Sequence, residues 1–286
     1  MTMIKVAAVQ MCSGIDPEKN ARAMQALVRE AHASGATYVQ TPEMTGAVQR
    51  DRKGLFAILK DEADDIIVRT AASLAAEMKI HLHVGSTAIR LQDGKIANRG
   101  FLFGPDGALV CRYDKIHMFD VDLDNGESWR ESAVYQPGET AVTADLPFGR
   151  LGFAICYDLR FPQLFRAEAL AGADVISLPA AFTRQTGEAH WDVLVRARAI
   201  ENGVFMIAAA QAGLHEDGRE TYGHSIIVDP WGRVLAQASG TGEAVVTADI
   251  DIAEVRSARQ KVPNLRNARD FHVHLATDGT SGGKPA

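Results

Sequence analysis

The sequence predicts an α/β fold with helices on the outside and two β-sheets on the inside. The order strand–helix–strand–helix–strand occurs once in each half of the chain. The strand segments are almost continuously apolar, as is typical of sheets covered on both faces. No shift in composition marks a linker between the halves. We therefore expect one domain over residues 1–276, built from two similar halves.

The first half begins with a buried strand, "IKVAAVQMCS", and continues with a helix in "DPEKNARAMQALVREAHASG". Asp16 can cap this helix, Pro17 suits its first turn and Gly35 ends it. A second amphipathic helix is expected over about residues 61–78. The expected strands of this half are "ATYVQTPE", "IHLHVGSTAIR", "IANRGFLFG" and "ALVCRYDK".

A long polar loop is expected over residues 116–140, and loops of this length in globular domains are often functional. The second half then repeats the pattern of the first. Its expected elements are the hairpin "AVTADLPFGRLGFAICYD", the helix "FPQLFRAEALAG", the strand "ADVISLPAAF", the helix "EAHWDVLVRARAIEN" and the strand "VFMIAAAQ". "HSIIVDPWGRVLAQAS" and "EAVVTADID" close the sheet, and "DPWG" forms a turn. The Gly/Ser-rich tail, residues 277–286, is expected to be disordered.

The composition excludes several classes of protein. The 286 residues carry a net charge of −6 and no basic stripe, which argues against nucleic acid as a partner. No run approaches the roughly 18 apolar residues of a membrane span, and no signal-peptide core precedes the first strand. We therefore expect a cytoplasmic protein. The three cysteines are widely spaced and form no C-x-x-C pair, so neither a disulfide framework nor a structural zinc site is expected.

Three residues that could carry chemistry each end a strand pattern: Glu43, Lys115 and Cys156. Sites in α/β folds gather at the carboxyl ends of strands, where Glu43 could take the thiol proton and Lys115 could stabilise an oxyanion. Such a set would perform acyl transfer. Each residue also has a structural interpretation, as a core cysteine, a turn glutamate or a surface lysine. Cys12 and Cys111 lie within strand patterns with no charged cluster after them, and we interpret them as core residues.

Two histidine pairs suggest an alternative, metal-dependent chemistry. His81 and His83 lie on one expected strand, and His272 and His274 lie near the C-terminus. No carboxylate-rich motif joins them into a ligand set, so we expect His83 to be a core residue and the second pair to be a surface feature. A metal-dependent hydrolase therefore remains only an alternative.

Four segments resemble the carbon–nitrogen hydrolases of the nitrilase superfamily: "TPEMTG", "YDKIHMFD", "RLGFAICYDLRFP" and "AFTRQTGEAHWDVLVRARAIENGVFMIAAAQ". The resemblance covers roughly residues 4–269 in the right order. "YGHSIIVDPWG" and "FTRQTGEAHW" resemble the branch that contains deaminated glutathione amidase and omega-amidase. This resemblance implies a four-layer α-β-β-α sandwich, which agrees with the two-halves pattern.

The resemblance also implies roles for individual residues. Cys156 matches the nucleophile, Glu43 the general base and Lys115 the residue that stabilises the tetrahedral intermediate. The family's second catalytic glutamate matches Glu131. The loop around it departs from the family's usual sequence, and Glu127 is the alternative match.

The implied substrate pocket contains Tyr157, whose backbone N–H would complete the oxyanion hole, together with Arg160, Phe182 and Thr186. Arg160 could pair with a substrate carboxylate, or it could only brace acidic neighbours. The implied reaction is hydrolysis of a small carboxylate-bearing amide, of the deaminated glutathione kind, through a thioester. It needs no metal or organic cofactor.

Several alternatives stay open at this point. The substrate could be the omega-amide of a 2-oxo acid, a nitrile or an N-carbamoyl compound. A different class would be a non-catalytic interaction protein on the same fold. The resemblance further implies a homodimer or larger homo-oligomer, for which the helix "HWDVLVRARAIEN" is a candidate interface, against ordinary packing within one chain.

Overall fold

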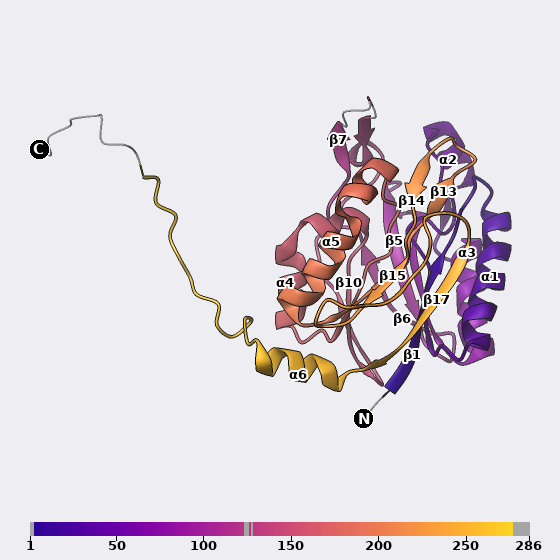
Figure 1. Ribbon diagram of the computed structural model, residues 1–286. Coiled ribbons are helices and arrows are strands. Elements are labelled where there is room, and N and C mark those ends of the chain that lie inside the picture. The colour runs from indigo at the N-terminus through magenta and orange to yellow at the C-terminus, as the bar shows by residue number, and fades with distance from the viewer. Residues whose placement is uncertain (1–2, 123–125, 127, 277–286) are drawn as a thin grey trace, which may run out of the picture.

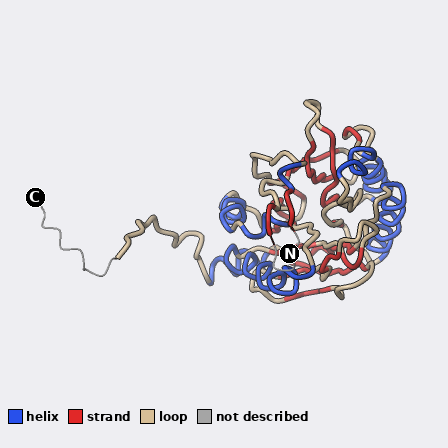
Figure 2. Tube along the Cα trace, turned by 90° about the horizontal axis from the view of Figure 1, so that it is seen from above, coloured by secondary structure: helices blue, strands red, loops and turns tan. Residues whose placement is uncertain are grey.

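Two large β-sheets lie face to face between two layers of helices in the computed structural model, which describes residues 3–122, 126 and 128–276. Helices α1 (Pro17–Ala33) and α3 (Ile66–Met78) cover one sheet, and α4 (Pro162–Leu170) and α5 (Arg184–Asn202) cover the other. Figure 1 shows the two helical layers on opposite sides, and Figure 2 shows the same layers from above. The expected four-layer α-β-β-α sandwich is confirmed. The C-terminal tail, residues 277–286, lies outside the described residues.

The first sheet has a parallel centre, in which β1 pairs with β2 and β2 pairs with β4. Antiparallel strands extend it on both sides. In spatial order it contains β17 (Ala244–Asp251), β1 (Met3–Gln10), β2 (Tyr38–Gln40), β4 (His81–Arg90), β5 (Ile96–Phe103) and β6 (Leu109–Asp114), while the short β3 (Lys60–Asp61) pairs with β4.

The second sheet repeats this arrangement, with parallel pairs β10–β11 and β11–β12 at its centre. Its spatial order is β16 (Val234–Gln237), β15 (Ile226–Val228), β12 (Phe205–Ala208), β11 (Val175–Ser177), β10 (Gly149–Phe153) and β9 (Thr143–Leu146). The last strand of the chain, β17, lies in the first sheet, where it pairs antiparallel with β1 along its whole length. The halves are therefore similar in design, and the end of the chain completes the sheet that its beginning started.

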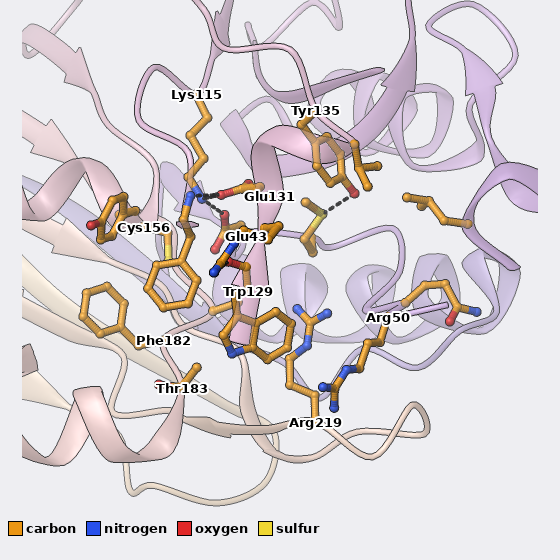
Figure 3. Close-up of a pocket in the computed structure, with 18 of the residues that line it drawn as sticks. Glu43, Arg50, Lys115, Trp129, Glu131, Tyr135, Cys156, Phe182, Thr183 and Arg219 are labelled. Carbon is orange, nitrogen blue, oxygen red and sulfur yellow. Dashed lines mark hydrogen bonds and ion pairs between the residues drawn. The ribbon is translucent and has the colours of Figure 1, made fainter. Parts of the chain in front are cut away.

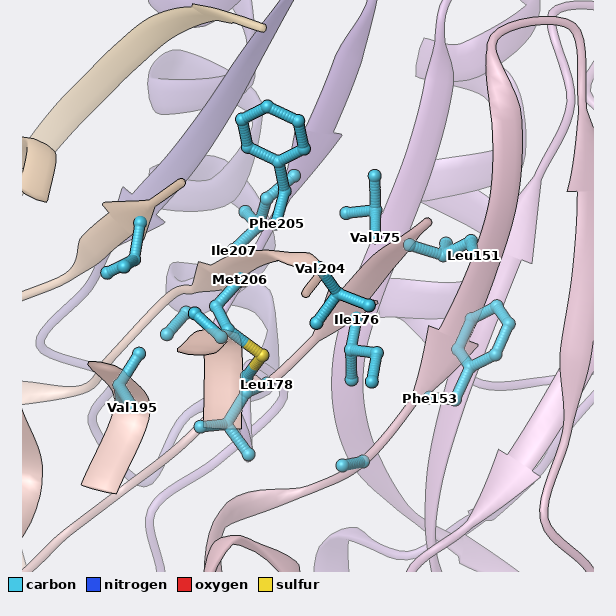
Figure 4. Packing of buried hydrophobic residues seen from close by; sticks show 14 of the residues in the cluster. Leu151, Phe153, Val175, Ile176, Leu178, Val195, Val204, Phe205, Met206 and Ile207 are labelled. Carbon is cyan, nitrogen blue, oxygen red and sulfur yellow. The ribbon is translucent and has the colours of Figure 1, made fainter. Parts of the chain in front are cut away.

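The apolar strands of the second sheet are buried on both faces, which explains their lack of alternation. Ile176 of β11 and Met206 of β12 are fully buried, as is Val195 on the inner face of α5. Figure 4 shows how these side chains pack with Leu151 and Phe153 of β10. Burying side chains of this size contributes about 1.5–3 kcal/mol each. This core holds the strand ends rigidly at the site.

Capping residues fix where the first helices begin. Asp16 accepts hydrogen bonds from the N–H groups of Glu18 and Lys19, as predicted. The second helix was expected from about residue 61, but α3 begins at Ile66. The reason is Asp65, whose carboxylate caps the helix by accepting from the N–H groups of Ile67 and Val68.

Several short elements have no counterpart among the predicted ones. They are the helices α2 (Arg52–Ile58) and α6 (Ala253–Lys261), and the hairpin of β13 (Ala212–Leu214) with β14 (Glu220–Tyr222). The long polar loop over residues 116–140 is partly ordered, because it contains β7 (Asp120–Asp122), β8 (Ser128–Arg130) and the 3₁₀ turn η1 (Glu131–Ala133). These segments are too short and polar for periodicity to reveal them. None of the helices in the described part of the chain is long and apolar enough to cross a membrane.

Candidate active site

Three strand ends bring the predicted reactive residues into one cavity. Glu43 lies three residues after β2, Lys115 directly follows β6, and Cys156 lies three residues after β10. All three line a cavity of about 300 Å³, and their exposed fractions are 4%, 2% and 7%. Figure 3 shows them at one end of this cavity. The two sheets therefore contribute to the same site, with the carboxylate and the ammonium on one sheet and the thiol on the other.

Lys115 lies between two carboxylates. Its Nζ atom is 2.9 Å from Oε1 of Glu43 and 2.8 and 3.0 Å from the two carboxylate oxygens of Glu131. The side-chain amide of Asn98 donates to both glutamates, at 2.9 and 3.2 Å, and the N–H of Phe119 donates to Glu131 at 2.7 Å. The structure thus places the predicted Glu131 against the lysine. Glu127 lies outside the described residues.

The two carboxylates keep Lys115 charged. Burial disfavours the ammonium, but the charges of Glu131 and Glu43 outweigh this effect and raise the pKa of Lys115 well above its ordinary value. A permanently protonated lysine can donate a hydrogen bond to an oxygen that gains negative charge during a reaction. The three groups together carry a net charge of −1, which disfavours a second anion beside Glu43.

Cys156 opens the 3₁₀ turn η2 (Cys156–Arg160), and its backbone φ of 50° lies in the left-handed region. A non-glycine residue adopts this conformation only when its surroundings enforce it, as at a sharp turn after a strand. Burial and the Glu43 carboxylate raise the pKa of the Cys156 thiol well above its ordinary value, and the opposing effect of Lys115 is smaller. The resting sulfur is therefore a thiol, and Glu43 beside it can accept its proton.

Asp158 connects the cysteine turn to the segment after β6. Its carboxylate is fully buried and accepts four hydrogen bonds. One oxygen accepts from the hydroxyl of Tyr113 at 2.7 Å and from the N–H of Ile155 at 2.8 Å. The other accepts from the N–H and the Nδ1 atom of His117 at 3.0 and 2.6 Å. Because His117 lies two residues after Lys115, this carboxylate links the positions of the lysine and the thiol.

Three of the four predicted pocket residues, Tyr157, Phe182 and Thr186, line the cavity. The fourth, Arg160, does not line the cavity and is half-buried beside two of these residues: its Cζ atom lies 6.0 Å from the centre of the Tyr157 ring and 5.5 Å from that of Phe182. Its guanidinium also lies 3.3 Å from Nδ1 of His190. Within the described ranges, Arg160 forms no ion pair with a carboxylate.

Sequence reasoning missed other residues of the site. Asn98 is a buried amide in a strand that is apolar apart from the neighbouring Arg99, and this anomaly could have marked it. Arg50, Trp129 and Arg219 also line the cavity, but they come from three distant segments with no common motif. No local signal in the sequence joins them.

The remaining histidines and cysteines do not join this cluster. Nδ1 of His83 lies 3.1 Å from the hydroxyl of Tyr38, and burial lowers the pKa of His83 to about 3, so it is a neutral core residue as expected. Cys12 and Cys111 are half-buried, and burial raises the pKa of Cys111 to about 12. In the part of the chain that the structure describes, no group of three or more His, Cys, Asp or Glu residues could hold a metal ion.

Comparisons with known proteins agree with this arrangement. The family model for carbon-nitrogen hydrolases matches residues 5–260. The chain is 39% identical over 272 residues to a deaminated glutathione amidase of Yersinia enterocolitica, covering 94% of each chain. It is 36% identical over 270 residues to the human omega-amidase NIT2, covering 94% of this chain and 96% of the relative. The crystal structure of the C. elegans NitFhit protein superposes with a TM-score of 0.84 at 34% identity, covering 93% of this chain and 65% of that longer chain.

Proposed function

Because the chain belongs to the carbon–nitrogen hydrolase family, we propose that this amide-hydrolysing enzyme acts on a small carboxylate-bearing amide of the deaminated glutathione kind. The products are an acid and an amine or ammonia. The observation that carries the proposal is the placement of Glu43, Lys115 and Cys156 within one buried cavity. A base, a permanent cation and a thiol in contact are the parts that acyl transfer needs.

The first half of the reaction forms a thioester. Glu43 takes the proton of the Cys156 thiol while the sulfur attacks the amide carbonyl. The oxyanion of the tetrahedral intermediate accepts hydrogen bonds from the Lys115 ammonium and the N–H of Tyr157. The intermediate collapses as Glu43 returns the proton to the leaving nitrogen, and the amine or ammonia departs.

The second half hydrolyses the thioester. Glu43 takes a proton from a water molecule, which attacks the thioester carbonyl, and Lys115 again stabilises the oxyanion. Collapse releases the carboxylic acid, and the sulfur regains its proton from Glu43. Glu131 supports both halves, since its contacts with Lys115 hold the ammonium in place and keep it charged.

Arg160 is proposed to receive the carboxylate of the acyl half of the substrate. It lies beside Tyr157 and Phe182, which line the cavity, and no carboxylate among the described residues neutralises it. A carboxylate in a closed pocket needs such a partner, because an unpaired buried charge is costly. The similarity to the human omega-amidase keeps amides of 2-oxo acids as the second candidate substrate class.

We further propose a single domain over residues 1–276, a cytoplasmic location and a homodimer or larger homo-oligomer. The pairing of β17 with β1 supports the single domain. The exposed apolar side chains of Val193 and Ile200 on α5, together with exposed Trp231, support an interface at this helix.

A panel of amides tests the proposed chemistry through the amine or ammonia that each releases. We expect turnover of deaminated glutathione and of 2-oxoglutaramate, weak turnover of neutral aliphatic amides, and no effect of EDTA. Cys156→Ala should abolish turnover and keep the wild-type melting curve, whereas the matched Cys12→Ala variant should keep turnover. Activity that survives Cys156→Ala, or turnover restricted to aliphatic nitriles, would contradict the proposal.

A further inference from the structure

The cavity has a positively charged end, separate from the reactive cluster. Arg50 and Arg219 lie on the side of Trp129 away from Cys156 (Figure 3). The Cζ atom of Arg219 lies 4.6 Å from the centre of a Trp129 ring, and that of Arg50 lies 5.2 Å from it. An arginine stacked on an aromatic ring uses the face of its planar guanidinium and leaves the N–H edge available for an anion. The tryptophan is thus in contact with two guanidinium groups from distant segments.

Three distant segments build this end of the cavity. Trp129 belongs to β8, Arg50 to the segment between β2 and α2, and Arg219 to the turn between β13 and β14. The β8 strand lies in the loop that also supplies Glu131, whose carboxylate holds Lys115. The arginine pair is therefore fixed relative to the reactive cluster through a few residues of chain.

The charges at this end are only partly neutralised. Nη2 of Arg219 forms an ion pair with Oδ2 of Asp217 at 3.6 Å, which is too long for a hydrogen bond. The buried Nε atom of Arg219 has no hydrogen-bond partner. Arg50 has no ion-pair partner among the residues that the structure describes. A third lining arginine, Arg130, is already paired with Asp122. Arg50 and Arg219 thus leave positive charge available to a ligand.

The two ends of the cavity consequently have opposite polarity. The inner cluster of Glu43, Glu131 and Lys115 carries a net charge of −1, whereas the outer end carries the arginine pair. A negatively charged group is repelled beside Glu43 and attracted at the outer end, so a second carboxylate, other than the one that Arg160 is proposed to receive, is favoured at the arginine pair. A substrate is therefore oriented with its amide at Cys156 and an anionic terminus beyond Trp129.

We propose that Arg50 and Arg219, held on Trp129, form a second carboxylate-binding subsite that receives the leaving-group half of the substrate. This inference rests on the proposed amidase function. Arg50 is exposed, so the outer end opens to solvent. The amine must leave by an open end while the acyl group stays on Cys156. The preferred leaving group is thus a peptide-like amine with a free terminal carboxylate, and ammonia is a poorer match.

Three substrates that share the same acyl group and differ in the leaving group test the subsite: deaminated glutathione, its analogue with a C-terminal carboxamide, and 2-oxoglutaramate. We expect Arg50→Gln and Arg219→Gln each to raise KM for deaminated glutathione about tenfold or more, which is the effect of losing a charge-assisted hydrogen bond. KM for the other two substrates and all kcat values should change less than about twofold. Arg50→Lys should restore part of the loss because it keeps the charge. Arg29→Gln is the matched control, because Arg29 is an exposed arginine that pairs with Glu77 far from the cavity.

The outcomes separate this inference from the proposed function. Equal KM for the carboxylate and carboxamide substrates in the wild-type enzyme would overturn the subsite and leave the amidase intact. A uniform rise in KM for all three substrates in the variants would show a structural role and would also overturn it. If the wild-type enzyme hydrolyses none of them, the proposed function fails. Calorimetry on Cys156→Ala then decides the subsite: binding of deaminated glutathione about tenfold tighter than of its carboxamide supports it, and equal binding overturns it.

Discussion

The buried carboxylate of Asp158 can be tested by Asp158→Asn, which keeps the shape of the side chain and removes its charge. Asp158 accepts two hydrogen bonds at each oxygen, and each oxygen receives one backbone N–H, from Ile155 or from His117. An asparagine has one oxygen and one NH₂ group. Whichever way its amide turns, the NH₂ group faces one of these backbone N–H groups, and neither of them can become an acceptor.

The expected loss of stability follows from this geometry. One buried N–H is left without an acceptor, which costs about 1–3 kcal/mol, and each remaining hydrogen bond to Asp158 loses its charge assistance, about 1 kcal/mol apiece. The side chains of Tyr113 and His117 can turn to keep a hydrogen bond with the asparagine. We therefore expect the substitution to lower the free energy of unfolding by about 3–5 kcal/mol in total. We also expect kcat to fall, since Asp158 links the segment that carries Lys115 to the cysteine turn.

Urea unfolding of the variant, with kcat measured per folded enzyme, checks both expectations. Asp145→Asn is the matched control, because Asp145 forms an exposed ion pair with Arg150, and exposed ion pairs contribute little to stability. A loss below about 1 kcal/mol in Asp158→Asn would refute the hydrogen-bond reasoning. A large loss of stability with an unchanged kcat would refute the link between Asp158 and the reactive groups.

Three further predictions follow from the buried groups. Lys115→Met should lower the rate at least about 10²-fold, the scale of a lost oxyanion donor, and Lys115→Arg should fail too; near-normal turnover of the arginine variant would contradict the oxyanion role. Iodoacetamide should modify Cys156 faster than Cys12 or Cys111, because Glu43 can take the thiol proton while the sulfur attacks, although the pKa of the resting thiol is raised; equal labelling in peptide maps would contradict this. Burial lowers the pKa of His83 to about 3, so this histidine contributes stability above the unfolded-state pKa of about 6.5 that is lost as the pH falls. Between about pH 7 and about pH 5 this loss of unfolding free energy is about 2 kcal/mol. Urea unfolding at these two pH values should show a smaller loss for His83→Gln than for the wild-type protein; equal losses would contradict the assignment.

The strand ends of the reactive site could be read from the sequence because they follow strong local patterns. Glu43 and Cys156 follow central parallel strands, and Lys115 follows the outer strand β6, which runs parallel to β4 because both pair antiparallel with β5, so Glu43 and Lys115 lie at the same edge of the first sheet. Asp16 likewise marked the start of a helix by a local rule. The start of α3 was misplaced because several acidic residues precede it and only Asp65 caps it.

Long-range pairing limited what the sequence could show. The stacking of Arg50 and Arg219 on Trp129 needs three segments that no periodicity relates. The bracing role of Asp158 depends on Tyr113 and His117, more than forty residues away in the chain. Such contacts are set by the packing of the two sheets, so local patterns cannot reveal them.

The pairing of β17 with β1 has a consequence for the order of events on the ribosome. Met3 pairs with Asp251 and Gln10 with Ala244, so β1 cannot form this pairing until β17 has been synthesised, near the end of the chain. At about 5–20 residues per second, the wait is about 10–50 s. Throughout that interval one edge of β1 has free N–H and C=O groups beside an apolar strand, which is the kind of edge that pairs with other chains. The nascent protein is therefore most prone to aggregation before residue 251 emerges, and a trigger-factor-type chaperone should raise its soluble yield more than it helps refolding of the full-length chain.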